Sequence, residues 1–359
     1  MDRRDFLKKT GAVAVAGAGM AAAPAIARST IKWKMVTTWP KNFPGLGTGA
    51  NNLARLITEM SGGRLKVKVY GAKELVPAFE VFDAVSRGTA EMGHASAYYW
   101  KGKVPEAQFF STMPFGMTAQ EMNGWIYYGG GQQLWDKAYE PFGVLGRPAG
   151  NTGVQMGGWF NKEINSLEDL KGLKMRIPGL GGEVLKRLGG TPVNLPGGEL
   201  FTALTSGTID ATEWVGPYND LAFGLYKAAK YYYYPGFHEP GTILEALINR
   251  KAFEELPKDL QSIVLNACKV VNMDMLAEYS ARNPGALDQL VNKHGVQLRA
   301  YPDDVLQQLR KVSVEVAEEL AGQNKAAAEI YKSYDAFLQA SRKYTRISDL
   351  AYLEARDGK

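Results

Sequence analysis

Apolar positions in the first hundred residues switch between the spacing of strands and the spacing of helices. Residues 31–36 and 65–69 carry apolar side chains at alternate positions with lysines between them, which predicts two partly exposed strands. Residues 50–57 carry apolar side chains at helical spacing, and a short helix over 78–86 is expected before a strand over 90–94. Strands that alternate with helices are typical of α/β proteins with largely parallel sheets.

Longer helical patterns dominate the second half of the chain. Pro257 suits the first turn of a helix in which residues 260–267 share one apolar face. Residues 305–344 are almost continuously helical in pattern, and the Gly-Gln-Asn sequence at 322–324 is expected to interrupt them. Such a helix is longer than one lobe, so we expect it either to brace two lobes or to reach a second subunit.

One helix–turn–strand unit occurs twice. Residues 82–95 and 201–214 share Phe, Ala, Gly and Thr at matching positions, and each predicts a short helix, a glycine turn and a strand. Ligands of open α/β sheets bind beyond the carboxyl ends of the strands. Two lobes with one copy each could therefore place two strand ends across one cleft. The copies diverge at this point, because the first carries His94 where the second carries Glu213, followed by Trp214.

Charge and composition exclude several classes of function. The formal net charge of +5 is too small to indicate binding of nucleic acid. Cys268 is the single cysteine, so an internal disulfide is impossible, and its helical apolar surroundings favour a buried, inert thiol. With His94, His238 and His294 as the only histidines, the chain offers no ligand set for an iron–sulfur cluster, a c-type haem or structural zinc.

The first residues resemble a twin-arginine export signal. Arg3-Arg4 precedes an apolar, glycine- and alanine-rich stretch over 11–23, and Ala25-Ile-Ala27 supplies a small-x-small cleavage pattern. An amphipathic N-terminal helix is the alternative, which Pro24 and the glycines disfavour. The stretch is short for a membrane span. We therefore expect residues 1–27 to be removed and the protein to fold before export to the periplasm.

Several motifs together resemble the extracytoplasmic solute receptors of TRAP transporters, the DctP-type family. The resemblance covers nearly the whole chain after the signal, in order. Within the family, the segments around Trp159-Phe160 and Thr212–Trp214 are most similar to the branch that binds 2-oxo or 2-hydroxy monocarboxylates with a metal ion. The family motifs are Met113-Pro-Phe-Gly116, Gly172–Pro178, Gly189–Val193, Gly198–Asp210 and Leu247–Pro257.

The resemblance implies an α/β, two-lobed, periplasmic-binding-protein-like fold with a hinged cleft and a long C-terminal helix. Residues 28–152 would form the first segment of lobe I, and residues 153–237 would form lobe II. Residues 238–300 would return to lobe I and supply the hinge. Residues 301–359 would form long helices that brace the lobes or form a dimer.

The same resemblance assigns roles to residues of the second lobe. Arg176 matches the arginine that clamps the ligand carboxylate, for which a planar guanidinium is well suited. Gln155 matches an amide that contacts both metal and ligand. Glu213 and the carbonyl of Trp214 match metal ligands, with the indole as a cleft wall, and Glu239 is a further acid near the metal. From the residues alone, an ordinary strand arginine, a solvated acid and a core tryptophan are the alternatives.

In the first lobe, Ser96, Ala97 and Tyr98 match a strand-end segment that touches the ligand. Tyr99 and Trp100 are further candidates for the lining of the cleft. Aromatic side chains at these positions would serve equally well in a core.

The resemblance implies a receptor without catalytic residues. It would close on a small organic acid that a sodium or calcium ion chelates, and would pass it to the small and large membrane subunits of a transporter. One carboxylate ligand would favour sodium, and two would favour calcium. The helix over 305–344 is similar to the segment through which this branch forms homodimers. Alternatives are a sugar acid or dicarboxylate as ligand, or a secreted enzyme, although the chain has no Gly-x-Ser-x-Gly motif.

Overall fold

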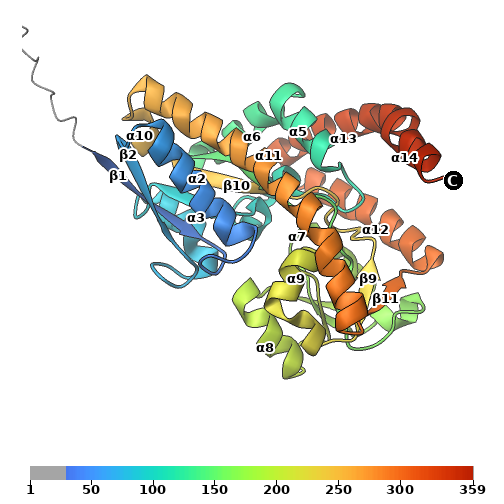
Figure 1. The fold of residues 1–359 in the computed structure, drawn as a ribbon. Coiled ribbons are helices and arrows are strands. Elements are labelled where there is room, and N and C mark those ends of the chain that lie inside the picture. Colours follow the sequence, from blue (N-terminus) through green and yellow to red (C-terminus); the bar gives the residue numbers. More distant parts are fainter. Residues whose placement is uncertain (1–29, 359) are drawn as a thin grey trace, which may run out of the picture.

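The chain folds around two separate β-sheets, as the ribbon in Figure 1 shows. The computed structural model describes residues 30–358, so the predicted export signal at 1–27 lies outside the described residues. One sheet has five strands in the order β2-β1-β3-β10-β4, and the other has six in the order β11-β9-β5-β8-β6-β7. The predicted α/β, two-lobed fold is confirmed.

Lobe I is built on the five-stranded sheet. The sheet is mixed, because β1 is parallel to β2 and β3 while β10 runs antiparallel to β3 and β4. Helix α2 packs against β2 with its apolar stripe, the one that the helical spacing of residues 50–57 predicted. The elements are β1 (Ile31–Thr37), α2 (Leu46–Met60), β2 (Leu65–Tyr70), α3 (Val81–Ser86), β3 (Met92–Ala95), α4 (Gln108–Ser111), α5 (Ala119–Tyr128), α6 (Gly131–Tyr139), β4 (Val144–Asn151), β10 (Ile243–Asn249) and α10 (Arg250–Glu254).

Lobe II is built on the six-stranded sheet, whose strands are short. β6 lies between β7 and β8 and is parallel to both, whereas β5 runs antiparallel to β8 and β9. The elements are β5 (Gly158–Phe160), β6 (Lys174–Arg176), α7 (Gly179–Arg187), β7 (Thr191–Val193), α8 (Leu200–Thr205), β8 (Ala211–Thr212), α9 (Pro217–Phe223), β9 (Tyr231–Tyr234) and β11 (Gln297–Ala300).

The two copies of the sequence repeat form the same unit in the two lobes. In lobe I, α3 leads through Gly88 into β3, and in lobe II, α8 leads through Gly207 into β8. Both glycines have a positive φ, +74° for Gly88 and +72° for Gly207, a conformation that side chains with a Cβ rarely adopt. Each repeat strand lies inside its sheet, with β3 between β1 and β10 and β8 between β5 and β6.

Three segments connect the lobes. Residues 152–157 lead from β4 to β5, and residues 235–242 lead from β9 back to β10. The third is α11 (Lys258–Asp288), whose 31 residues span about 46 Å at the helical rise per residue. It packs on α2 and β4 in lobe I and on α9 in lobe II, and Figure 1 shows it running along both lobes.

Residues 238–300 are expected to return to lobe I and to supply the hinge, but the structure divides them between the two sheets. β10 joins the five-stranded sheet, as that expectation requires. β11, however, pairs in parallel with β9 and extends the six-stranded sheet. The length of α11 is the reason, because a helix that spans both lobes delivers the chain to the far side of lobe II.

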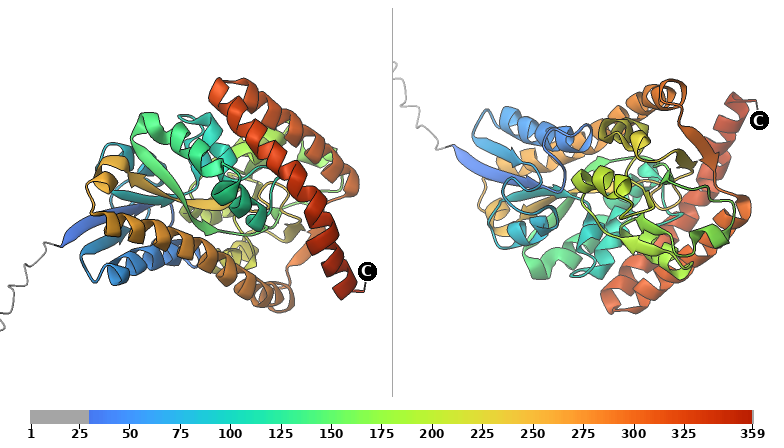
Figure 2. Two further views of the ribbon diagram at one scale, coloured as in Figure 1. Left: turned by 90° about the horizontal axis from the view of Figure 1, so that it is seen from above. Right: turned by 90° about the horizontal axis from the view of Figure 1, so that it is seen from below.

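The C-terminal helices α12 (Asp303–Gly322) and α13 (Lys325–Thr345) form an antiparallel pair at one side of the molecule (Figure 2). The break expected at residues 322–324 occurs between them, where the Asn324 side chain accepts a hydrogen bond from the Ala327 N–H as N-cap. α12 packs on α7 of lobe II, and α13 packs on α5 and α6 of lobe I. The pair therefore braces both lobes. A final helix, α14 (Ala351–Arg356), follows.

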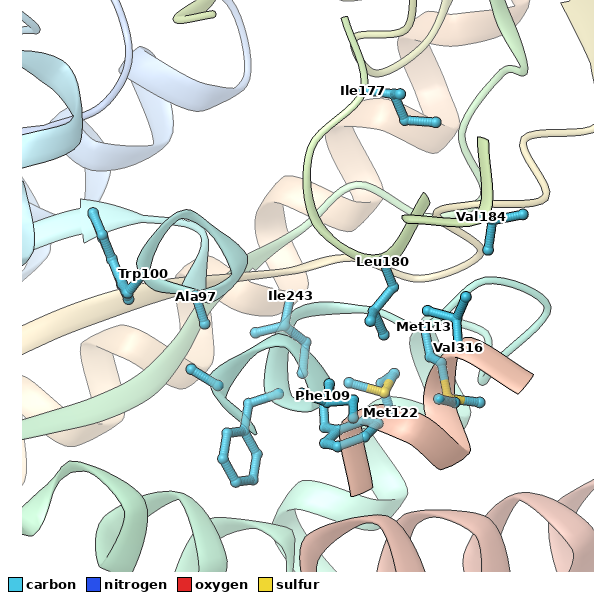
Figure 3. Packing of buried hydrophobic residues seen from close by; sticks show 14 of the residues in the cluster. Ala97, Trp100, Phe109, Met113, Met122, Ile177, Leu180, Val184, Ile243 and Val316 are labelled. Carbon is cyan, nitrogen blue, oxygen red and sulfur yellow. The ribbon is translucent and has the colours of Figure 1, made fainter. Parts of the chain in front are cut away.

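One apolar cluster crosses the boundary between the lobes. It joins Phe109 and Met113 of lobe I to Leu180 of α7 and Val316 of α12, and Figure 3 shows these side chains gathered together. A core shared in this way holds the lobes against each other. No helix within residues 30–358 is long and apolar enough to cross a membrane.

Candidate ligand and metal site

Two parallel strands of lobe II deliver an arginine and a glutamate to the same edge of the sheet. Arg176 is the last residue of β6, and Glu213 directly follows β8. The strands pair with Arg176 opposite Thr212, and the Glu213 N–H donates to the Arg176 carbonyl over 3.2 Å. Their side chains therefore emerge at the carboxyl ends of neighbouring strands, where α/β folds bind ligands.

Arg176 is buried, and each of its three side-chain nitrogens donates a hydrogen bond. Its side chain is 1% exposed, and Nη1 donates to the Glu213 carboxylate. Nε donates to the Leu195 carbonyl over 3.1 Å, and Nη2 donates to the Tyr99 hydroxyl over 3.3 Å. Burial alone would lower the pKa of Arg176, but the charge of Glu213 raises it above its usual value. The guanidinium, which also lies 5.1 Å from the ring centre of Trp214, thus stays charged inside the protein.

The two loop connections between the lobes bind each other and form a hinge strap, residues 152–157 and 235–242. The Thr152 N–H donates to the Thr242 carbonyl over 3.1 Å, and the Gln155 N–H donates to the Glu239 carbonyl over 3.1 Å. Gly236 donates back to the Gln155 carbonyl over 3.0 Å. A Cβ on Gly236 would lie 2.2 Å from that carbonyl oxygen, so only glycine permits this approach.

The hinge strap places a second buried carboxylate, that of Glu239, near Glu213. The Glu239 carboxylate accepts hydrogen bonds from Gln155 Nε2 over 2.7 Å and from the Thr242 hydroxyl over 2.6 Å. Burial, followed by the nearby charge of Glu213, raises the pKa of Glu239 to about 7. Glu213, His238 and Glu239 each offer a ligand atom, and these atoms lie within 4.8 Å of one another. Such a pair of buried carboxylates is favourable only when positive charge lies beside it.

Several buried polar atoms at this point have no partner within residues 30–358. They are Gln155 Oε1, Glu213 Oε2, the indole Nε1 of Trp214 and both ring nitrogens of His238. Buried polar atoms are nearly always hydrogen-bonded, so a group of unsatisfied ones marks a place for a ligand. Carboxylate and amide oxygens are the donors that hard cations prefer. The residues present therefore fit a bound sodium or calcium ion.

Lobe I contributes tyrosines to the same place. Tyr99 meets Arg176, as described above, and burial followed by the charge of Glu239 raises the pKa of Tyr98 well above its usual value. Ser96 instead forms a hydrogen bond with the Ser111 hydroxyl, and the Trp100 indole donates to Glu245 over 2.6 Å. The structure thus brings Tyr98 and Tyr99 to the site.

The remaining candidates of lobe I face its core. The Ser96 and Trp100 side chains are occupied by the partners just given, and Ala97 belongs to the apolar cluster shared by the lobes. Contact between Ser96 or Ala97 and a ligand would have to come from the backbone.

Two buried groups near the site were not predicted from the sequence. His238 lies next to Glu239 in one loop, and this adjacency of two titratable residues is a signal that the sequence does contain. Asp220 accepts hydrogen bonds from the Trp159 indole over 2.9 Å and the Tyr232 hydroxyl over 2.6 Å, and it also receives the Val215 N–H over 3.4 Å. It thereby anchors the backbone that follows Trp214, a role that only the tertiary structure reveals.

His94, which ends the first copy of the repeat, has a structural role. Its Nδ1 accepts a hydrogen bond from the Trp39 indole over 2.7 Å, and its Nε2 lies 2.9 Å from the Ala149 carbonyl. Burial lowers the pKa of His94 to about 4, so the ring is neutral and donates from Nε2. Trp39 in turn lies edge-on to Trp214, with ring centres 6.5 Å apart. The first copy of the repeat therefore packs, through Trp39, against Trp214 of the second copy.

Two lobes joined by a hinge strap, with a buried arginine and converging oxygen atoms between them, define a two-lobed solute-binding protein. The chain belongs to the bacterial extracellular solute-binding proteins of family 7, whose model matches residues 35–324. The resemblance to DctP-type receptors is thereby confirmed. A curated relative from Nostoc sp., named monocarboxylate 2-oxoacid-binding periplasmic protein, is 44% identical over 98% of each chain.

Two similar solved structures are periplasmic solute-binding proteins of TRAP transporters. The protein from Pseudoalteromonas atlantica, with bound sodium and pyruvate, is 46% identical with a TM-score of 0.88, and the match covers 90% of this chain and 99% of that one. The protein from Colwellia psychrerythraea, with bound calcium and pyruvate, is 47% identical with a TM-score of 0.88, and the match covers 91% and 99% of the two chains.

Proposed function

We propose that this protein is the periplasmic receptor of a TRAP transporter and captures a small 2-oxo or 2-hydroxy monocarboxylate, such as pyruvate or lactate, together with a sodium or calcium ion. The observation that carries the proposal is the fully buried Arg176 beside the unsatisfied oxygens of Gln155 and Glu213. The pyruvate and metal ions of the two similar structures support the same choice.

Different residues would bind the acid and the cation. Arg176 would hold the carboxylate of the acid, because its planar guanidinium can present two parallel donors. Gln155 Oε1, Glu213, the carbonyl of Trp214 and Glu239 would hold the cation. When bound, the cation would supply charge neutralisation and chelation of the carboxylate and the adjacent 2-oxygen. This arrangement would favour 2-substituted acids over simple ones such as acetate.

The second carboxylate bears on the choice of cation. Glu213 and Glu239 are both buried, and both belong to the cluster of possible metal ligands. Two ionised carboxylates balance a divalent ion better than a monovalent one. We therefore propose that calcium binds more tightly than sodium whenever Glu239 is ionised.

The proposed function is tested by a panel of ligands in a thermal-shift assay. Pyruvate, longer 2-oxo acids, lactate, dicarboxylates and sugar acids would each be added with calcium and with a chelator. A ligand of the native state raises the melting temperature by mass action. We expect the largest increase with pyruvate or lactate and calcium. An increase with a sugar acid or dicarboxylate alone would move this receptor to another branch of the family.

Binding without catalysis is part of the proposal. The family consists of solute-binding proteins, and no catalytic residue is assigned. NMR spectra of pyruvate or lactate incubated with the protein and calcium should remain unchanged. Conversion of either acid would instead favour the alternative of a secreted enzyme.

Export and assembly complete the proposal. We propose export by the twin-arginine route, on the Arg3-Arg4 motif and the stretch that follows it. The loaded receptor would deliver its acid to the small and large membrane subunits. Replacement of Arg3-Arg4 by lysines should block export, as fractionation of cells would show.

We propose that the protein is a homodimer held by the end of its C-terminal helices. Large apolar side chains are exposed there, and a second copy is the occupant that the branch resemblance implies. Ile347→Glu should convert a dimer into a monomer in sedimentation velocity, and a monomeric unmodified protein at micromolar concentration would contradict the dimer. The exposed side chains are Tyr344, Ile347, Leu350, Tyr352 and Leu353.

A further inference from the structure

His238 carries polar atoms that the proposed set of metal and carboxylate ligands does not use. The side chain is 1% exposed, and Nε2 lies 3.4 Å from Glu213 Oε2 without a hydrogen bond. Neither ring nitrogen has a hydrogen-bond partner in the part of the chain that the structure describes. A buried imidazole without partners is costly, so its retention here indicates a partner that arrives with the ligand.

Packing fixes the direction of the His238 ring. The side chain stands against α7 at Gly181, where an added Cβ would lie 3.0 Å from His238 Cβ. On another side, Phe237 packs edge-on to the ring, with centres 5.4 Å apart. The imidazole therefore stays beside Glu213 and Glu239, and its Nε2 faces the interior of the cluster.

The order of groups around Glu213 locates the part of the ligand that His238 would meet. Arg176 binds Glu213 at Oε1, whereas His238 lies at Oε2. An acid with its carboxylate at Arg176 and its cation at Glu213 would extend from the Oε1 side of Glu213 to the Oε2 side. Its 2-substituent would then lie on the side of His238.

We propose that His238 forms a hydrogen bond with the oxygen at position 2 of the bound acid and thereby selects for that oxygen. This inference rests on the proposed function. A hard cation takes oxygen ligands, which leaves the imidazole nitrogens available for hydrogen bonding. A neutral imidazole has one N–H and one lone pair, so one tautomer donates to a 2-oxo group and the other accepts from a 2-hydroxyl. One side chain can thus serve both kinds of acid.

The inference makes acids without the 2-oxygen poor ligands. A site that is built to hydrogen-bond a group rejects an analogue that lacks it, because the buried polar atom stays unpaired. Propionate has the carbon chain and carboxylate of lactate but no oxygen at position 2. It is therefore the matched probe for His238.

The test is calorimetric titration of the mature protein with pyruvate, lactate and propionate in saturating calcium. His238→Phe should lower the preference for pyruvate over propionate by about tenfold, the loss expected for one buried hydrogen bond. His238→Gln keeps a donor and an acceptor and should restore most of the preference. Gly181→Ala places a Cβ 3.0 Å from both His238 Cβ and Ile177 Cδ1, and it should change the ratio in the same direction as His238→Phe. Calcium binding in the absence of acid is the control for each variant, because loss of a ligand of the cation would weaken it much more than loss of a group that meets only the acid.

The results of this titration distinguish failure of the His238 inference from failure of the proposed function. If His238 had a purely structural role, its replacement would weaken the binding of pyruvate and propionate equally. An unchanged ratio of the two affinities in folded His238→Phe and Gly181→Ala would therefore overturn the inference. Binding of pyruvate by these variants would still support the proposed function. Loss of calcium affinity without acid would make His238 a metal ligand and overturn the inference as well. If the unmodified protein bound neither pyruvate nor lactate, the proposed function would fail and the inference with it.

Discussion

Arg176 and Glu213 form a buried ion pair at the carboxyl ends of two parallel strands, and each is the principal charged partner of the other. Glu213 occupies the point where the sequence repeat departs from its symmetry, since the first copy carries the neutral His94 at the matching position. The two positions therefore have different roles. His94 supports Trp214 through Trp39, whereas Glu213 binds the arginine with one oxygen and leaves the other without a partner among the described residues.

Removal of one member of this pair should destabilise the protein and abolish binding. Arg176→Ala leaves a buried carboxylate without its partner, which is expected to lower the free energy of unfolding by about 3 kcal/mol. Urea denaturation and calorimetry with pyruvate measure the two effects. Arg176→Lys is the matched control, because it keeps the charge but loses the two parallel donors. It should retain most of the stability and still bind pyruvate poorly. Undiminished binding by Arg176→Ala would rule out its role as carboxylate clamp.

Ion pairs across the cleft should stabilise the closed arrangement of the lobes. Lys73 of lobe I contacts Glu199 of lobe II over 2.8 Å, and Lys101 contacts Glu183 over 2.9 Å. Both pairs are largely exposed, so each is expected to contribute less than about 1 kcal/mol. The double variant Lys73→Gln, Lys101→Gln should therefore weaken pyruvate binding only about three- to tenfold.

The salt dependence of binding provides the control for this prediction. Added salt screens exposed pairs, so pyruvate affinity of the unmodified protein should fall with ionic strength more steeply than that of the double variant. Lys171 contacts Glu168 over 2.7 Å within lobe II, so Lys171→Gln removes a similar pair without crossing the cleft. Equal losses of affinity in Lys171→Gln and the double variant would contradict a role in closure.

The contribution of Glu245 to the stability of lobe I should decrease as pH rises from about 5 to 8. Burial raises the pKa of Glu245 to about 8, and the carboxyl group accepts hydrogen bonds from Trp100 and Tyr139. Because the folded-state pKa lies above the unfolded one, the stabilisation is fully present below the unfolded value and is lost as pH rises through the folded value. The slope from this group approaches about 1.4 kcal/mol per pH unit. Glu245→Gln should remove this contribution from the pH dependence of stability in urea denaturation, and an unchanged slope would contradict the assignment.

The close contact in the hinge strap should couple stability to binding. Gly236→Ala places a Cβ 2.2 Å from the Gln155 carbonyl oxygen, so the strap must separate and the Gln155 amide must shift with it. We expect a lower melting temperature and a loss of pyruvate affinity of at least about tenfold, since small displacements of positioning groups are costly. Gly102→Ala is the control, because nothing lies within 4 Å of the added Cβ. Full affinity in Gly236→Ala would show that the strap does not position Gln155.

The sequence predicts secondary structure well where apolar residues repeat at helical spacing over a long segment. The helix over residues 50–57 and the interrupted helix near the C-terminus were predictable because each repeats its apolar stripe over several turns. The repeat was readable because it keeps a glycine where the chain needs a positive φ. The strands of lobe II were less accessible, since β8 has two residues and β6 has three, too few to establish an alternation.

The site itself depends on contacts that no local pattern encodes. Gln155 and Glu239 meet because two distant segments pair in the hinge strap, and His238 reaches Glu213 from the same segment as Glu239. Asp220 is buried beneath the site by partners from β5 and β9. The family motifs indicate Arg176 and Glu213, whereas the hinge strap and its unsatisfied polar atoms exist only in the tertiary structure.

A crystal structure of the mature protein grown with pyruvate and calcium tests the central claim most directly. The account predicts the pyruvate carboxylate on Arg176 and an anomalous calcium peak within coordination distance of Gln155 Oε1 and Glu213, on the side of the hinge strap. Pyruvate bound away from Arg176, or bound there without a cation at Glu213, would contradict it.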